Sequence, residues 1–598
     1  MDTKESAQPT PSRPARWPAF LLVAVGLACI GGGVAIYSLS GADPAPYAKP
    51  KVEPKGLSWS YEEVFPNWPK DRKPEFVLVI SGQTYGYLQK CGCSDPQKGG
   101  LERRFNFIAG LNKMGIEAVP IDLGDVAPEI NSENRLQTEQ ALLKYVTAMR
   151  IMKEMGYKAV GAGKAEFALD MVKIYAEYAL QPGNREPGII MSNLEGILSG
   201  AEVIGKDKVF VDEKSAPVMR DWVLTPTKAG PSVGVVSIVG SPVIDDIKKI
   251  DKSMVFGATK VTQKLMEDAV GAIGKERKKD KGIDVLLYNG PVKLAPAVSK
   301  LLPQFRIIVA MSEEAEPPAA PMLVDPAKPD SPWVIRVGHK GQSLGVVGVF
   351  KTEKGFELMY QKVTLTPEFE TPDDMEALAK NLALVELEKY SKTVKDRDFL
   401  SKNPKMAHPL QVTNPLAAYT GSASCLGCHK DHGDSGKVWQ ASKHAQAYAA
   451  LDTIAKRPSL RNFDPECIRC HTVGYDYKTG YVNAALTPQL QNVGCENCHG
   501  PGSQHVAMPN NKEKALELSP WKINGKGNLP TAEQMKQYME ERDPAARQKI
   551  IGEAEMKVML NVDRVCQTCH NTENDPHFKI EVYWPKIVHS LKPVAKAP

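Results

Sequence analysis

Four Cys-x-x-Cys-His motifs lie in the last third of this 598-residue chain, and they constrain its fold more than any other feature. The motifs run Cys425–His429, Cys467–His471, Cys495–His499 and Cys566–His570. They hold eight of the 11 cysteines, and ten of the 11 histidines lie at or after His408. Two thiols three positions apart, followed directly by an imidazole, form one compact set of metal- or cofactor-binding groups. Nearly all such chemistry is therefore concentrated in one region.

The spacing within each motif fits covalent attachment of a c-type haem. The two thiols add to the two vinyl groups of one haem, and the imidazole that follows binds the iron as proximal ligand. Structural zinc also uses Cys-x-x-Cys pairs, but neither zinc nor a disulfide scaffold requires a His directly after the second Cys. We therefore expect four c-type haems, attached through Cys425, Cys428, Cys467, Cys470, Cys495, Cys498, Cys566 and Cys569, with His429, His471, His499 and His570 as proximal ligands.

Further histidines in the same region could supply the second axial ligands. They are His408, His432, His444, His505, His577 and His589. Six imidazoles for four irons allow every iron to bind two histidines, or leave one iron open. His432 lies about one helical turn after His429, so it is expected to serve a neighbouring haem rather than the same one. Abundant histidine favours bis-histidine sites, whose potentials are lower than those of Met/His sites.

The residues around the motifs resemble the multihaem cytochrome c-554 family. The similar segments, which span residues 410–590, are Tyr419–Cys425, Ser442–Ala445, Asn492–Ser503 and Tyr583–Ile587. The resemblance implies that His444, His505 and His589 are distal ligands, and His432 remains a further candidate. It also implies haems that stack in close pairs to relay electrons, with room for one five-coordinate iron. The sequence does not identify which iron that is.

The N-terminus has the pattern of a membrane anchor. Basic residues precede an almost uninterrupted apolar run from Ala19 to Tyr37 that is about long enough to span a bilayer. We expect residues 1–18 to be cytoplasmic, residues 19–40 to form an uncleaved signal anchor, and the Pro-rich residues 41–73 to form a tether. A cleaved signal, with Ser38–Ser40 as a weak cleavage site, is the alternative. The pattern predicts a single-pass protein of the cell membrane with most of the chain in the periplasm.

Residues 74–366 alternate between short apolar runs and helical patterns, which indicates an α/β domain. The first predicted strand is Phe76–Ile80, and the last apolar runs, without a helix between them, predict a mixed sheet edge. A connecting helix and linker are expected over residues 367–407, followed by the haem domain over residues 408–598. The predicted architecture is multidomain: a membrane helix, an α/β domain, and a mostly α and irregular multihaem domain.

The α/β region resembles the calcineurin-like metallophosphoesterases, in particular the 5′-nucleotidase type. The resemblance rests on the first strand with Gly99–Arg104, and on Ile121–Asp125 at a later strand end. That family holds two metals with Asp and His and uses them to activate water. Only Asp125 keeps the expected type here. The other ligand positions are replaced by Ser81–Gln83, Gly161–Lys164, Tyr288–Gly290 and Met311–Glu314. The resemblance therefore implies the phosphoesterase fold with its activity lost.

Cys91-Gly92-Cys93 allows several interpretations. The pair could be a structural disulfide, two free thiols, or a redox or metal site near the haems. The net charge of +5, without a basic helix, predicts no nucleic-acid partner.

The sequence as a whole predicts an electron carrier that passes electrons from a membrane donor to a periplasmic acceptor. Two alternatives stay open. One is a multihaem redox enzyme that acts on a small nitrogen or sulfur compound at a five-coordinate haem. The other is a phosphohydrolase with a cytochrome tail.

Overall fold

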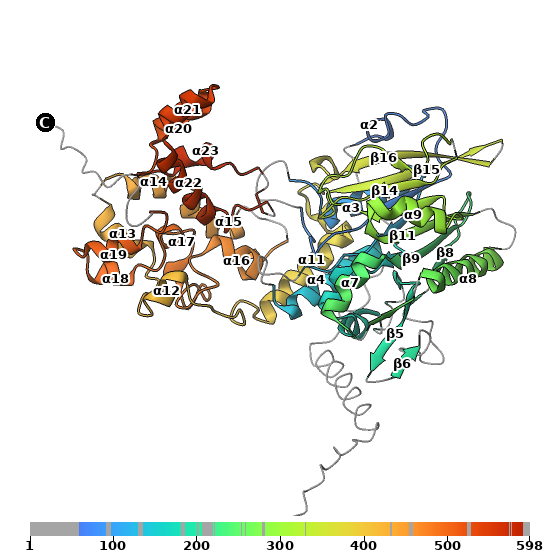
Figure 1. Ribbon diagram of the computed structural model, residues 1–598, viewed down its shortest axis with the longest axis horizontal. Coiled ribbons are helices and arrows are strands. Elements are labelled where there is room, and N and C mark those ends of the chain that lie inside the picture. Colours follow the sequence, from blue (N-terminus) through green and yellow to red (C-terminus); the bar gives the residue numbers. More distant parts are fainter. Residues whose placement is uncertain are drawn as a thin grey trace, which may run out of the picture. The chain divides into compact units, whose positions relative to one another are not determined.

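The computed structural model describes most of the chain between residues 59 and 589 (Figure 1). The residues outside the description are 1–58, 91–96, 130–135, 180, 182–183, 185, 200–201, 206–218, 221, 253, 258, 278–281, 329, 354, 431–432, 454–457, 523–527, 573, 576 and 590–598. The predicted signal anchor, most of the tether, the Cys91/Cys93 pair and His432 therefore lie outside the described residues. Among the helices that are described, none is both long and apolar enough to cross a membrane.

Two large β-sheets form the framework of the first region. The first sheet has the spatial order β16 (Gly355–Thr364), β15 (Ser343–Thr352), β1 (Phe76–Ser81), β2 (Glu117–Asp122), β3 (Ala159–Gly161), β4 (Gly188–Ile190) and β7 (Met219–Arg220). The second has the order β13 (Met322–Leu323), β14 (Trp333–Arg336), β12 (Ile307–Met311), β11 (Ile283–Pro291), β9 (Val233–Val239) and β8 (Trp222–Thr225). A small third sheet contains β10 (Met254–Phe256), β5 (Leu194–Ser199) and β6 (Glu202–Gly205).

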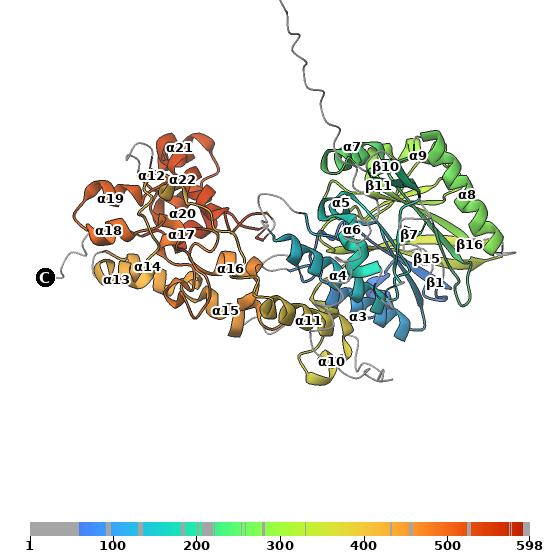
Figure 2. The ribbon, with the colours of Figure 1, turned by 90° about the horizontal axis from the view of Figure 1, so that it is seen from below.

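Apolar side chains join these elements into four layers. Along β1, Leu78 faces the second sheet and lies in one buried cluster with Val235 and Leu287. Val77 faces the other way, because neighbouring side chains of a strand alternate between its faces, and it packs in a cluster with α3 and α4. Helices α8 and α9 cover the far face of the second sheet, so the two helical layers lie on opposite sides of the strands (Figure 2). The helices of this region are α2 (Tyr61–Val64), α3 (Leu101–Lys113), α4 (Thr138–Glu154), α5 (Lys164–Leu169), α6 (Met171–Ile174), α7 (Ser241–Ile250), α8 (Thr259–Arg277) and α9 (Ala295–Leu301).

The predicted α/β character is confirmed, with one local correction. The strand predicted at Phe76–Ile80 is β1, and β1 to β4 run parallel while β15 and β16 form an antiparallel edge. The single connecting helix expected after residue 367 is instead two helices, α10 (Met375–Lys380) and α11 (Leu382–Asp396). The break falls at Asn381, whose backbone is extended and whose side chain caps α11 by accepting from the Leu384 N–H.

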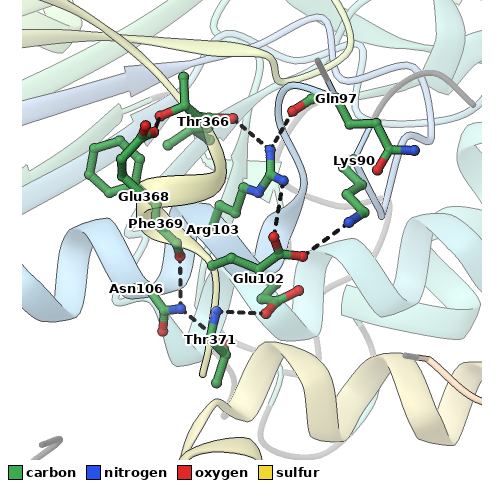
Figure 3. A network of polar contacts seen from close by, with 11 residues as sticks. Lys90, Gln97, Glu102, Arg103, Asn106, Thr366, Glu368, Phe369 and Thr371 are labelled. Carbon is green, nitrogen blue, oxygen red and sulfur yellow. Dashed lines mark hydrogen bonds and ion pairs between the residues drawn. The ribbon is translucent and has the colours of Figure 1, made fainter. Parts of the chain in front are cut away.

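A polar network ties α3 to the segment that follows β16 (Figure 3). Arg103 donates to the carbonyl oxygens of Gln97 at 2.6 Å and Leu365 at 3.1 Å. Its guanidinium also contacts the Glu370 carboxylate, which forms an ion pair with Lys90 at 3.0 Å. Lys90 and Gln97 border the undescribed segment that contains the Cys-Gly-Cys sequence. The network therefore fixes both ends of that segment against the α/β core.

The second region is helical, as predicted, and its core is small. Its helices are α12 (Pro409–Thr413), α13 (Ser422–His429), α14 (Ser435–Ala441), α15 (Ala447–Thr453), α16 (Pro465–His471), α17 (Cys495–His499), α18 (Ser503–Ala507), α19 (Lys512–Glu517), α20 (Ala532–Glu540), α21 (Pro544–Ile550), α22 (Glu553–Cys566) and α23 (Ile580–Tyr583). Of the described side chains, one apolar cluster gathers around Tyr475 and Leu490 and another around Met559 and Trp584. Loops and short helices carry the rest.

Candidate haem-binding site

Each motif lies on a helix or directly after one. The helix α13 ends at His429, α16 ends at His471, and α17 contains the whole third motif. In the fourth motif the first thiol ends α22 and the second lies in the turn that follows. Residues three apart lie on the same face of a helix, so in the first three motifs both thiols are directed to one side. All eight thiols are free rather than joined in disulfides, which is the state that covalent haem attachment requires.

Hydrogen bonds orient the imidazoles of three motifs. The Nδ1 atom of His471 contacts the carbonyl oxygen of Ala447 at 2.5 Å, and that of His499 contacts the carbonyl oxygen of Leu518 at 2.7 Å. The Nδ1 atom of His570 contacts the Asp575 carboxylate at 2.8 Å. Because these oxygens accept, Nδ1 carries the proton and Nε2 is left for a metal. Burial also lowers the pKa of His499 to about 4, which favours the neutral form that binds metals.

Three motif imidazoles each face a second imidazole from a distant part of the sequence. The ring centres are 6.3 Å apart for His429 and His505, 6.0 Å for His570 and His444, and 6.1 Å for His499 and His589. A metal–imidazole bond is about 2 Å long and the ring centre lies about 1 Å further, so two axial imidazoles on one iron have centres about 6 Å apart. The separation of the rings in each pair therefore matches that of two axial imidazoles on one iron.

These pairs contain the three histidines that the family resemblance implied as distal ligands. The other candidates behave differently. His408 caps α12, where its Nδ1 accepts from the Leu410 N–H at 3.1 Å, and its ring lies against Tyr419 and Tyr477. His577 is exposed. Among the described residues, no second imidazole faces the ring of His471, and His432 lies outside that set.

Thiols from different motifs also meet. The neighbouring Cys425 thiol of the first motif lowers the pKa of Cys495 in the third motif to about 7. The neighbouring Cys470 thiol of the second motif likewise lowers the pKa of Cys569 in the fourth motif. Cys566 also interacts electrostatically with Cys498 of the third motif. The attachment points are thus adjacent in the order first, third, fourth, second, which fits the close pairs that the resemblance implies.

Glu496, inside the third motif, holds two motif regions together, and sequence reasoning did not identify this role. Its side chain is 3% exposed and accepts the backbone N–H groups of Thr420 and Gly421, just before α13. It also accepts the N–H of Gly502, just before α18 and His505. One buried carboxylate therefore fixes the backbone on both sides of the His429–His505 pair. Its position in a Cys-Glu-Asn-Cys-His sequence gave no signal of these distant partners.

In the α/β region, the positions that would carry metal ligands are occupied by hydrogen-bonded side chains. The hydroxyl of Ser81 contacts the Asp122 carboxylate at 2.5 Å, the Tyr157 hydroxyl at 2.9 Å and the Arg104 guanidinium at 3.2 Å. Gln83 exchanges two hydrogen bonds with the backbone of Ser312. Within the described part of the chain, no three His, Cys, Asp or Glu side chains gather as a metal site.

Asp125, the one retained ligand type, takes part in a buried carboxylate arrangement. Its side chain accepts the Ala165 N–H at 2.9 Å, and its backbone N–H donates to Glu166 at 3.0 Å. Burial, opposed by that backbone donor, raises the pKa of Asp125 to about 6. Glu166 also accepts the N–H groups of Val126, Ala127 and Gly163. Both carboxylates are therefore used to fix the loop after β2 and the start of α5.

Comparison with known proteins finds a likeness within the second region. The family model of cytochrome c554 and c-prime matches residues 424–500, which contain the first three motifs. Cytochrome c-554 of Nitrosomonas europaea is 33% identical over 113 residues, which are 17% of this chain and 47% of that protein. The chain thus spans about half the length of this relative. The predicted resemblance to the cytochrome c-554 family is confirmed for this segment, and it implies c-type haem.

Solved structures similar to the chain include enzymes whose names mark them as nucleotidases, all at low identity. The sulfate thiohydrolase of Thermus thermophilus has a TM-score of 0.39 at 12% identity, covering 56% of this chain and 63% of that one. A 5′-nucleotidase precursor from Thermus thermophilus has a TM-score of 0.37 at 15% identity, covering 56% and 60%. The NAD nucleotidase of Haemophilus influenzae has a TM-score of 0.38 at 11% identity, covering 58% and 64%. Likenesses at this level leave the activity of the region to be argued from its own residues.

Proposed function

We propose that this protein is an exported, membrane-anchored tetrahaem c-type cytochrome that transfers electrons between a membrane donor and a periplasmic acceptor. The observation that carries the proposal is the set of three imidazole pairs with ring centres 6.0–6.3 Å apart. When bound, haem supplies a reversible one-electron couple at its iron. The chain supplies two axial imidazoles from fixed positions, and two rigid ligands favour electron transfer over binding of a substrate.

The count of four rests on the likeness of the fourth motif to the other three. That motif lies beyond the segment that matches the cytochrome family, which ends at residue 500. It nevertheless supplies free thiols at Cys566 and Cys569 and an imidazole, His570, that faces His444 at 6.0 Å. These are the groups found at the other sites. Contacts between thiols of neighbouring motifs support an array in which electrons move between adjacent haems.

The anchored, periplasmic location is proposed from the sequence alone. The basic residues before the apolar run from Ala19 to Tyr37 favour a cytoplasmic N-terminus and export of the remainder. Covalent attachment through two thiols also suits an oxidising compartment. On this proposal, the α/β region is a docking or structural module between the anchor and the haems.

A second candidate function depends on His471. Because no described imidazole faces its ring, the haem of the second motif is the one that could keep an open coordination position. Such a site would suit a redox enzyme that acts on a small nitrogen or sulfur compound. His432 is the histidine that would close the site if it binds there.

Electron paramagnetic resonance of the fully oxidised protein tests both proposals, together with a haem count by mass spectrometry. We expect four haems, of which at least three are low-spin. His505→Ala should convert one low-spin ferric signal to high-spin, whereas the exposed His577→Ala should leave every signal unchanged. If the wild-type protein shows a high-spin ferric signal and His432→Ala retains it, the result favours the enzyme. If the wild-type protein shows no high-spin signal, the result favours the carrier. A protein without haem, or unchanged spectra for His444→Ala, His505→Ala and His589→Ala, would contradict the proposed function.

A further inference from the structure

The hydrogen bond behind His570 differs in kind from those behind the other oriented motif imidazoles. His471 and His499 contact backbone carbonyl oxygens, which are neutral. His570 contacts the Oδ2 atom of Asp575, a carboxylate, at 2.8 Å. Asp575 is 7% exposed, so solvent screens this contact little. Of these three sites, only the fourth motif's therefore has an anionic partner behind its motif imidazole.

The local fold holds this carboxylate in place. The backbone N–H of Asp575 donates to the carbonyl oxygen of Asn571 at 2.8 Å, in the turn that follows the motif. The carbonyl oxygen of Asp575 accepts the N–H of Phe578 at 3.0 Å. The Phe578 ring in turn stacks on the His570 ring, with centres 4.7 Å apart and planes 20° apart. The carboxylate and the imidazole therefore belong to one ordered unit rather than to a mobile surface pair.

A carboxylate that accepts a hydrogen bond from the Nδ1 atom of a ligating imidazole changes the reduction potential of the metal bound at Nε2. It pulls the Nδ1 proton toward itself, which raises the basicity of the ligand at Nε2. A more basic ligand, together with a nearby negative charge, stabilises the oxidised iron relative to the reduced iron. A neutral carbonyl oxygen has the same effect to a smaller degree. The same haem chemistry should therefore have a lower potential at His570 than at His471 or His499.

We propose that Asp575 is a positioning residue that, through His570, gives the haem of the fourth motif a lower reduction potential than the haems of the second and third motifs. This inference rests on the proposed function, because it requires a haem iron bound by His570. It adds an order among these three sites: in a titration, the haem of the fourth motif is reduced after those of the second and third motifs. Thiols of the second and third motifs neighbour those of the fourth, where they contribute to the pKa shifts of Cys569 and Cys566.

The test uses the full-length, haem-loaded protein and its Asp575→Asn variant. Asparagine keeps the shape and an acceptor oxygen but removes the charge. We expect one potential, that of the fourth motif's haem, to rise by at least a tenfold change in the reduction equilibrium, about 59 mV for a one-electron couple. Spectroelectrochemical titration measures the potential, and electron paramagnetic resonance should show that the site stays low-spin with altered g-values. Asp575→Glu, which retains a carboxylate, is expected to keep the potential low.

Asp563→Asn is the matched control. Asp563 lies on α22 and interacts electrostatically with Cys566 of the same motif, so its removal reports the effect of charge alone. The inference is overturned if Asp575→Asn leaves all potentials unchanged, or shifts them no more than Asp563→Asn does. It is also overturned if Asp575→Glu shifts the potential as far as Asp575→Asn. Each of these results leaves the haems in place and the proposed function intact, whereas absence of haem from the wild type would remove the proposed function itself.

Discussion

The two regions of this chain bury apolar surface in different ways. In the α/β region, entire strands are buried: Phe76, Leu78 and Ile80 are each 0% exposed, between two sheets that close over them. In the haem-binding region, the helices α13 and α18 have no buried residue among those described, although they carry His429 and His505. The first region is stabilised by its own side chains, and the second is organised around thiols and imidazoles. Along this chain, the region with the larger apolar core carries few thiols and imidazoles, and the region rich in thiols and imidazoles has the smaller apolar core.

The largest difference between the two regions is expected when the full chain is produced without haem attachment. The α/β region should stay folded, because its sheets and helices already form a continuous core. The haem-binding region should lose its protection from hydrogen exchange, since binding of a prosthetic group that the unfolded chain cannot bind is itself folding free energy. Hydrogen–deuterium exchange with peptide resolution measures both regions at once. Equal protection after residue 408 in the haem-free and haem-loaded chains would show that the second region has a sufficient core of its own.

Leu78→Ala tests the other half of the comparison. The side chain is 0% exposed between the two sheets, so its truncation should lower the free energy of unfolding of the α/β region by about 2–5 kcal/mol. Denaturant unfolding followed by tryptophan fluorescence measures the loss, and the haem absorbance should not change. Leu301→Ala, at a position 46% exposed, is the control and should cost less than about 0.5 kcal/mol. A change in the haem spectrum of Leu78→Ala would mean that the two regions do not fold separately.

The sequence predicted the α/β region best where burial is continuous. The residues of β1 and β9 are apolar on both faces, and this pattern is recognisable without knowledge of their neighbours. The break between α10 and α11 was missed, because an apolar pattern continues through Asn381 and only the cap reveals the boundary. The four haem-binding motifs were predicted as readily, because the two thiols and the imidazole of each motif lie within five consecutive residues.

The unpredicted features depend on partners that are distant in the sequence. Glu496 contacts the N–H of Thr420, 76 positions away, and Glu166 contacts Val126, 40 positions away. Neither contact has a local pattern. The pairing of His570 with His444 was likewise open, because the sequence supplied the candidate ligands without stating which faces which. Asp575 lies only five positions from His570, but an Asp in a turn is too common to indicate a contact with an imidazole.

A smaller effect is expected for Glu166→Gln, which tests whether the α/β core depends on a buried polar arrangement. Each carboxylate oxygen of Glu166 accepts two backbone N–H groups. Glutamine would place an NH₂ group against two of these donors, so we expect a loss of about 1–3 kcal/mol in the free energy of unfolding. Burial and the charge of Asp125 raise the pKa of Glu166, while the backbone donors oppose that rise. Thermal unfolding measures the loss. An unchanged transition would mean that the loop after β2 does not need the carboxylate.

The smallest effect, and the one that tests whether the two regions are independent, is expected at Asp464. It caps α16, the helix of the second motif, by accepting the Glu466 N–H at 3.0 Å. It also accepts from Gln140 of α4 at 2.9 Å and from the Tyr390 hydroxyl of α11 at 3.4 Å. Asp464→Ala should therefore cost about 1–2 kcal/mol, part from the lost cap and part from the donors left without an acceptor.

Asp543→Ala is the matched control for that prediction. Asp543 caps α21 by accepting the Ala546 N–H at 2.7 Å and is exposed, so its loss should cost only the cap, about 1 kcal/mol, within the haem-binding region. Asp464→Ala alone should also lower the unfolding transition of the α/β region, because Gln140 lies on α4 of that region and Tyr390 lies on the connecting helix α11, which packs into the same core. Calorimetry with peptide-resolved hydrogen exchange separates the two transitions. If both variants affect only the haem-binding region, the hydrogen bonds from Asp464 do not couple the two regions. The α/β region and the haem-binding region would then unfold independently.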